Sequence, residues 1–240
     1  MSWLRIKTIF RREFASYFNS PIAYIFIGVF LVVSMWLFFQ GFFLSGQATM
    51  RSYLSLLPWI FLFLTPAITM RLWSEEKKSG TIEILLTLPI KDEEVVLGKF
   101  LSALAFLLVN LILSFTLPIT IAILGSLDWG PVIGGYIGAI FLGAAYLALG
   151  SYISALTKNQ IVAFLVAIVA SFIFFIIGSN MVIESVGPWL AGILSYIGLG
   201  SHFANIAKGV IDSRDIIYYL TFIAFFLILN VRALAGRQWK

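Results

Sequence analysis

The sequence lacks cysteine altogether and holds a single histidine, His202, among its 240 residues. The absence of cysteine excludes disulfides and thiolate metal sites, and one histidine cannot by itself build a multi-histidine metal site. Charge is also scarce, because Asp, Glu, Lys and Arg make up 11% of the chain, against about a quarter of an ordinary soluble domain. With 61% hydrophobic residues and a mean hydropathy of +1.02, a water-soluble fold is not expected.

Long runs without any charged residue are the dominant feature that is present. A helix needs about 20 apolar residues to cross a hydrocarbon core of about 30 Å. Six runs meet this need, and the last of them is the shortest. They occupy residues 22–44, 53–70, 100–124, 132–156, 161–183 and 216–231. Because the runs are continuously apolar rather than alternating, we predict an all-α integral membrane protein, with residues 1–240 as one domain of six transmembrane helices.

The basic residues indicate how these helices are oriented. With a cytoplasmic N-terminus, only Arg51, Lys208 and Arg214 of the 16 Lys and Arg residues fall outside, and the other 13 fall inside. Basic residues are enriched in cytoplasmic loops, so we expect both termini in the cytoplasm. The net charge of +5 then reflects membrane topology, and no nucleic-acid partner is predicted.

Residues 1–20 precede the first run and are predicted to form an amphipathic helix. At 100° per residue, Ile6, Phe10, Phe14 and Tyr17 share one apolar sector, with basic and hydroxyl residues opposite. Such a helix lies in the membrane interface. It serves either as an anchor that orients the protein or as a contact for a cytoplasmic partner, and the sequence leaves both open.

The largest cytoplasmic segment, residues 71–99, holds 6 of the 11 acidic residues. Gly80 is placed to end one helix, and Thr81 to cap a short second helix that stops before Pro89. A helix of about two turns is marginal alone, so it must pack on its own membrane domain or on another protein. The acidic residues Glu75, Glu76 and Glu83 either make charged contacts there or form a solvated face.

Residues 184–215 form an outer segment that is too long for a simple connection. Its middle, 188–199, is apolar but too short to span a bilayer, so a re-entrant or interfacial segment is expected. Backbone of this kind at membrane depth faces protein or a water-filled cavity, which makes it a candidate to line or cap a pathway. For His202, a hydrogen-bonding role is weighed against a catalytic or metal role.

Catalytic and nucleotide-binding features are missing from the sequence. The six runs hold no Asp, Glu, Lys, Arg or His, and neither G-x-x-x-x-G-K-[ST] nor G-x-G-x-x-G occurs. We therefore expect a non-catalytic chain without a cofactor, whose energy comes from a partner. Glycines at four-residue spacing, Gly130, Gly134 and Gly138, with Gly143, predict close helix packing, within the chain or across a dimer.

The segment after the second run carries the most specific pattern. From Glu75 to Pro89 it reads E-E-x-x-x-G-T-x-E-x-L-L-T-x-P. Further matching features are Phe10 to Phe14 with Ser20-Pro21, Leu156 to Gln160, and His202-Phe203 through Asp215 and Tyr218-Tyr219. In this layout the chain resembles the permease subunits of ABC transporters of the type-2 exporter class, particularly those of the gliding-motility and nitrous-oxide-reductase-maturation kind.

The resemblance implies a membrane subunit that pairs with a second permease subunit, identical or related, and binds two cytoplasmic ATPase subunits, in a prokaryotic inner membrane. The helix from Gly80 to Leu88, which we call the coupling segment, would sit in a cleft of the ATPase, with the N-terminal helix beside it. The residues implied to contact the ATPase are Glu75, Glu76, Gly80, Thr81, Glu83, Leu85, Leu86, Lys158 and Asn159. Those implied to form an outer gate are Pro188, Trp189, His202, Phe203 and Asp212.

Two other functions remain open at this point. The first is a membrane scaffold or assembly subunit that docks a cytoplasmic partner without transport. The second is a membrane-embedded enzyme, which the lack of polar groups in the spans disfavours. Membrane lipid is the surrounding partner in every case, and the transported substrate is not readable from the sequence.

Overall fold

The computed structural model describes residues 2–82, 90–210 and 212–236, and helices form almost all of this part of the chain. The predicted all-α integral membrane class is confirmed. The helices are α1 (Trp3–Phe18), α2 (Pro21–Ser45), α3 (Arg51–Thr69), α4 (Arg71–Ser79), α6 (Asp92–Ser114), α7 (Thr116–Leu124), α8 (Trp129–Leu156), α9 (Gln160–Ile176), α10 (Asn180–Ile183), α11 (Pro188–Ile197), α12 (Leu199–Ala207) and α13 (Ser213–Ala235).

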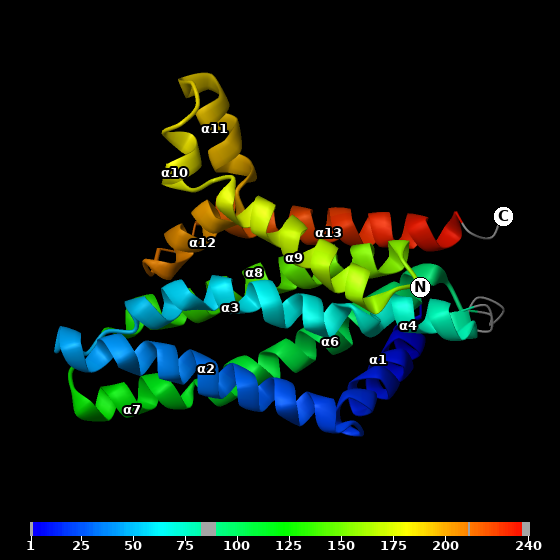
Figure 1. Cartoon of the computed structure of the whole chain (residues 1–240), viewed down its shortest axis with the longest axis horizontal. Coiled ribbons are helices and arrows are strands. Elements are labelled where there is room, and N and C mark those ends of the chain that lie inside the picture. Colours follow the sequence, from blue (N-terminus) through cyan, green and yellow to red (C-terminus); the bar gives the residue numbers. More distant parts are fainter. Residues whose placement is uncertain (1, 83–89, 211, 237–240) are drawn as a thin grey trace.

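The long helices run roughly parallel to one axis, and α10 and α11 project from the side of this bundle (Figure 1). Among the described residues, five stretches are long and apolar enough to cross a membrane: α2, α3 with α4, α6 with α7, α8, and α13. The α11–α12 pair, bent by 70°, would make a sixth if it were one span. α9 is apolar but has only 17 residues.

Local signals explain where several helices begin and end. α2 begins at Pro21 directly after Ser20, whose hydroxyl accepts a hydrogen bond from Ile22 N at 3.4 Å. α4 ends at Gly80, which has φ +73°, a left-handed conformation that glycine adopts without strain. The prediction that Gly80 ends a helix is therefore confirmed.

α8 is the central helix of the bundle. Within its apolar stretch 78% of the residues are buried, against 22% in α2 and in α13. Lipid tails are as apolar as the helix surfaces, so the hydrophobic effect does not drive helices together in a membrane and close packing has to do so. Gly134 allows α12 to approach α8 closely, because a Cβ at this position would lie 2.6 Å from Ile206 O of α12. Gly138 likewise faces Phe203 and Ile206. These two glycines of the predicted pattern thus pack within the chain.

Helix boundaries differ from the predicted spans in three places. The third run breaks at Phe115 between α6 and α7, where Pro118 lacks the N–H that would bond Ser114 O. The fifth run, 161–183, is helical only to Ile176 before a turn, and Gly178 in that turn lies close to the backbone of Gly198. The sixth run, 216–231, corresponds to α13, which has 23 residues and extends beyond the run at both ends.

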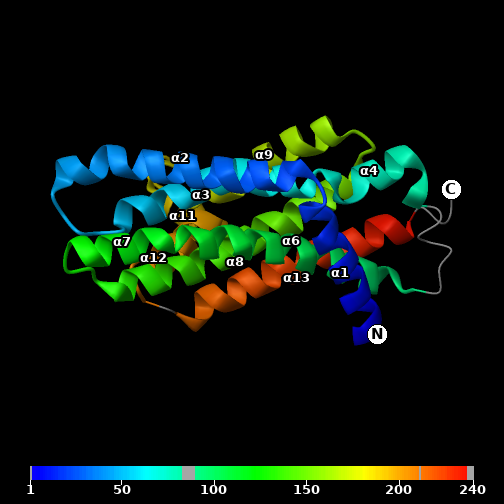
Figure 2. The ribbon, with the colours of Figure 1, turned by 90° about the horizontal axis from the view of Figure 1, so that it is seen from below.

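The two ends of the bundle carry different elements. α1, α4 and the C-terminal end of α13 gather at one end in both views (Figures 1 and 2). The α2–α3 and α7–α8 connections lie at the other end. α1 crosses the bundle and packs on α6, where Ile6 is buried. The described ATPase-contact residues lie at the end with α1 and α4, whereas the predicted gate residues lie on α11, on α12 and at the start of α13.

Candidate functional site

The amino-terminal helix α1 is fastened to the start of α6 by charged groups. Glu94 accepts a hydrogen bond from Ser2 N at 2.5 Å, and its other oxygen lies 3.5 Å from Arg5 Nη1. Gly98, one turn further along α6, lets Ile9 approach closely, since a Cβ there would lie 2.8 Å from Ile9 Cβ. The position of α1 is thus fixed by the same helix that follows the coupling segment.

A buried lysine joins α1, α6 and α4. Lys99 is 2% exposed, and its Nζ lies 2.7 Å from Glu76 Oε1 and 3.2 Å from Glu13 Oε1. The ammonium also lies over the Trp73 ring, 5.1 Å from its centroid. Burying an ammonium is costly unless opposite charges and hydrogen bonds compensate it, and here two carboxylates do so. We refer to Glu13, Trp73, Glu76 and Lys99 as the lysine cluster.

Trp73 extends this cluster into the centre of the bundle. Its Nε1 donates to Ser151 Oγ of α8 at 3.2 Å, and Asn230 Nδ2 of α13 donates to the same oxygen at 2.7 Å. One turn along α8, Ser154 Oγ accepts from the backbone N–H groups of Trp73 and Ser74, each at 3.2 Å. α4 is therefore bonded directly to α6 and α8, and through Lys99 and Ser151 it is connected to α1 and α13.

The predicted ATPase contacts divide between this anchored part and an exposed end. Glu76 points into the lysine cluster, whereas Glu75 is exposed and pairs with Arg71 at 3.0 Å. Gly80 and Thr81 are exposed at the end of α4. Glu83, Leu85 and Leu86 lie outside the described residues.

Lys158 and Asn159 lie in the turn between α8 and α9, and both are exposed. Asn159 caps α9, because its side chain accepts from Ile161 N at 2.9 Å. The start of α9 lies beside α4 at the same end of the bundle (Figures 1 and 2). The structure therefore gathers Gly80, Thr81, Lys158 and Asn159 at one end, as a site for a shared partner requires.

At the other candidate site, side chains clasp the corner between α11 and α12. His202 Nε2 lies 2.9 Å from Tyr196 O, Tyr219 donates to Leu199 O at 2.8 Å, and Tyr218 donates to Ile197 O. A helix end leaves its last carbonyls without intrahelical partners. His202 and Tyr218 bond such carbonyls at the end of α11, and Tyr219 bonds the first carbonyl of α12; we call this arrangement the outer corner.

His202 forms a buried pair with Asp215. The distance from Nδ1 to Asp215 Oδ1 is 2.5 Å, and the imidazole stacks on the Tyr218 ring at 4.0 Å. The other ring nitrogen, Nε2, lies at hydrogen-bond distance from Tyr196 O, so both nitrogens of the ring have a partner. This arrangement favours the hydrogen-bonding role predicted for His202.

The other predicted gate residues lie apart from this pair. Phe203 is buried on α12, and Asp212 is exposed and caps α13 by accepting from Arg214 N at 2.9 Å. Pro188 and Trp189 begin α11 and are exposed, on the part that projects from the bundle (Figure 1). The structure therefore does not bring the five residues into one gate.

Sequence reasoning missed three partners: Glu13, Lys99 and Asp215. Asp215 had a detectable signal, because Asp215, Tyr218 and Tyr219 are three and four residues apart on one helical face that begins at a charge-free run. Lys99 and Glu13 had none, because they are separated by 86 residues. No group of three His, Asp or Glu side chains that could hold a metal gathers within residues 2–82, 90–210 and 212–236.

Comparison with known proteins decides the family. The pattern of the family described as ABC-2 family transporter protein matches residues 8–231. The chain belongs to this ABC-2 family. The matched range includes the lysine cluster and the outer corner. No curated protein sequence matches the chain significantly.

Membership establishes the general role. The chain is an ABC-2 type permease, a multi-pass membrane component of a transport system. The match does not separate the gliding-motility or nitrous-oxide-reductase-maturation kind from other ABC-2 permeases, so that subtype stays a prediction.

Proposed function

We propose that this permease receives the work of cytoplasmic ATPase subunits through the coupling segment. The observation that carries the proposal is the anchoring of α4. Its inward side bonds to Lys99 of α6 and to Ser151 and Ser154 of α8, which in turn bond to α1 and α13, while its end at Gly80 is exposed. A displacement applied beyond Gly80 therefore acts directly on α6 and α8, and through them on α1 and α13. Packed elements of this kind shift between discrete arrangements rather than deform continuously.

In this proposal the end that carries α1, α4 and the α8–α9 turn faces the cytoplasm. The excess of basic residues in the corresponding segments supports that orientation. Gly80, Thr81, Lys158 and Asn159 would contact the ATPase directly, and so would Glu83, Leu85 and Leu86 in the coupling segment. Glu76 would act from within, by holding α4 on Lys99.

We also propose that two permease subunits together form the pathway, as an identical or related pair. The centre of this bundle is filled by α8, so its surface rather than its interior is available to a transported molecule. The outer corner would then lie at the exit, where its clasped carbonyls would keep α11 and α12 in place. This part of the proposal draws on the family resemblance and on the burial of α8.

A charge reversal in the α8–α9 turn tests the ATPase contact. Lys158→Glu places a carboxylate at the proposed contact, and Lys208→Glu makes the same change at an exposed residue near the opposite end of the bundle. The tagged chain is purified from its native membranes with an ATP analogue, and captured nucleotide-binding subunits are identified. Lys158→Glu should lower their capture, and Lys208→Glu should leave it unchanged.

Transport is measured separately on the assembled complex. Variants of Gly80 and Glu83 should lower permease-dependent ATPase activity and ATP-dependent cargo movement together. Unchanged values of both would refute the role of the coupling segment. Capture of an ATPase without any ATP-dependent movement would instead support the scaffold function.

A further inference from the structure

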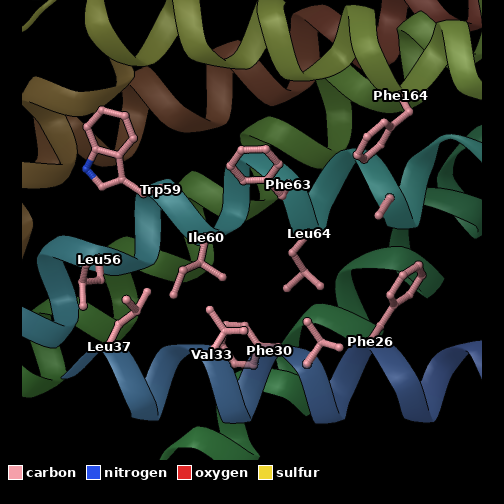
Figure 3. Close-up of a pocket in the computed structure, with 12 residues that line it drawn as sticks. Phe26, Phe30, Val33, Leu37, Leu56, Trp59, Ile60, Phe63, Leu64 and Phe164 are labelled. Carbon is pink, nitrogen blue, oxygen red and sulfur yellow. The ribbon is translucent and has the colours of Figure 1, made fainter. Parts of the chain in front are cut away.

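An apolar groove opens on the side of the bundle between α2 and α3 (Figure 3). Its volume is about 470 Å³, and every residue that lines it is aliphatic or aromatic. Phe30 and Val33 of α2 face Ile60 and Leu64 of α3, and Phe164 reaches in from α9. The groove is therefore suited to hydrocarbon.

The groove runs along the length of the transmembrane helices. Along α2 it extends from Phe26 to Leu37, which is about 16 Å at a rise of 1.5 Å per residue. A hydrocarbon core is about 30 Å thick, so the groove covers about half of that thickness. Phe26 lies about one turn inside the start of α2, so the groove begins near one membrane interface and passes the middle of the bilayer.

A polar pocket of about 290 Å³ continues the groove at the interface. Phe26 and Ala67 line both spaces, so the two adjoin. The polar pocket lies where α1 meets α2, and it is lined by Ser20, Tyr17 and Arg71 among others. An apolar groove about 16 Å long, with a polar pocket at its interfacial end, suits a lipid that has an acyl chain and a polar headgroup.

The polar pocket offers hydrogen-bond donors. The Tyr17 hydroxyl is buried and has no hydrogen-bond partner among the described residues. Burial, together with the nearby Glu13 carboxylate, raises the pKa of Tyr17, so the phenol keeps its proton at neutral pH. Arg71 pairs with Glu75 through Nε, which uses one of the five N–H donors of its guanidinium. Donors of both kinds suit a phosphodiester.

We propose that this composite space binds a membrane phospholipid, with one acyl chain in the groove and the phosphodiester at Arg71 and Tyr17. The carboxylates of Glu13 and Glu75 in the same pocket favour a headgroup that also carries an amine. The site rests on the placement of the chain in a membrane and does not require ATPase docking.

Photolabelling tests the acyl-chain part. The chain is reconstituted in vesicles of phosphatidylethanolamine and phosphatidylglycerol that contain a phosphatidylethanolamine with a photoreactive acyl chain. Adducts are mapped by mass spectrometry. They should concentrate on the groove residues of α2 and α3, above the level on the exposed face of α13. Ala67→Trp, which fills the junction of the two spaces, should lower groove adducts at least fivefold. Ala224→Trp, on α13, should leave them unchanged.

The headgroup part has its own matched variants. Tyr17→Phe removes only the hydroxyl, and Arg71→Gln removes the charge; each should lower groove adducts about fivefold, the effect of losing one hydrogen bond. Arg232→Gln on α13 is the control. A diacylglycerol probe with the same photoreactive chain should label wild type no better than the phospholipid labels Arg71→Gln. Equal labelling by both probes would refute phosphodiester recognition.

Two outcomes would overturn the site as a whole. One is groove labelling that does not exceed labelling of α13 or that survives Ala67→Trp. The other is disulfide-linked dimers of Val33→Cys formed in high yield without groove adducts, which would show a second copy of the chain in the groove. ATPase capture by Ala67→Trp is measured in parallel. Retained capture with lost labelling supports the lipid site, and lost capture with retained labelling counts against it.

Discussion

Glu76 binds Lys99 across two helices, with 2.7 Å between Oε1 and Nζ. Glu13 shares the same ammonium at 3.2 Å, so a single buried cation connects α4 to α6 and α1. The second oxygen of Glu76 is buried without a hydrogen-bond partner among the described residues. The joint therefore depends on Lys99 more than on either carboxylate alone.

Replacing Lys99 with methionine should destabilise the permease strongly. Removing one partner of a buried ion pair leaves an uncompensated buried charge and costs about 3–5 kcal/mol. Two carboxylates would be left facing each other around an apolar side chain. The measurement is thermal unfolding of the purified chain in detergent, in which Lys99→Met should lower Tm clearly below that of wild type.

The exposed pair Arg71–Glu75 is the control for Lys99→Met, because both side chains are at least one-third exposed. Surface pairs contribute about 0–1 kcal/mol, so Glu75→Gln should change Tm little. Glu13→Gln and Glu76→Gln added to Lys99→Met should restore part of the lost stability. Equal effects of Lys99→Met and Glu75→Gln would show that the cluster does not hold α4.

The sequence predicted the parts of the fold that depend on local composition. Charge-free runs located α2, α3, α8 and α13, because the cost of placing charge in hydrocarbon acts on each residue separately. The helix end at Gly80 was also predictable, because the left-handed conformation is a preference of glycine itself. The lysine cluster was not, because Glu13 and Lys99 meet only through the packing of α1 on α6. The close approach of Gly178 to Gly198 beyond the end of α9 likewise arises from packing between residues 20 apart in the sequence.

Gly134→Ala should destabilise the packing of α8 on α12. The added Cβ would lie 2.6 Å from Ile206 O, a backbone atom that cannot move without displacing its helix. Overpacking of this kind costs about 1–3 kcal/mol. Gly192→Ala on α11 is the matched change, because a Cβ there meets no atom within 4 Å. A lower Tm for Gly134→Ala alone, in the same detergent, is the expected result; equal Tm values would contradict this packing.

Loss of the His202–Asp215 pair should loosen the outer corner. Asp215→Asn removes the carboxylate that faces Nδ1, which weakens the hold of His202 on Tyr196 O. Because the chain has no cysteine, a single cysteine at Leu199, which is 0% exposed, reports opening of the corner through its rate of reaction with a maleimide. Asp215→Asn should raise that rate several-fold. Asp212→Asn, which keeps a capping oxygen at an exposed position, should not.

Orientation in the membrane can be tested with the same cysteine-free background. Lys158 and Lys208 are both exposed, and the distribution of basic residues places them on opposite sides of the membrane. In spheroplasts, a membrane-impermeant maleimide should label Lys208→Cys but not Lys158→Cys, and both should react equally once detergent is added. Labelling of Lys158→Cys alone would reverse the orientation and place Gly80 on the outside, where no cytoplasmic ATPase could reach it. That result would remove the basis for the proposed coupling while leaving the lysine cluster as a structural joint.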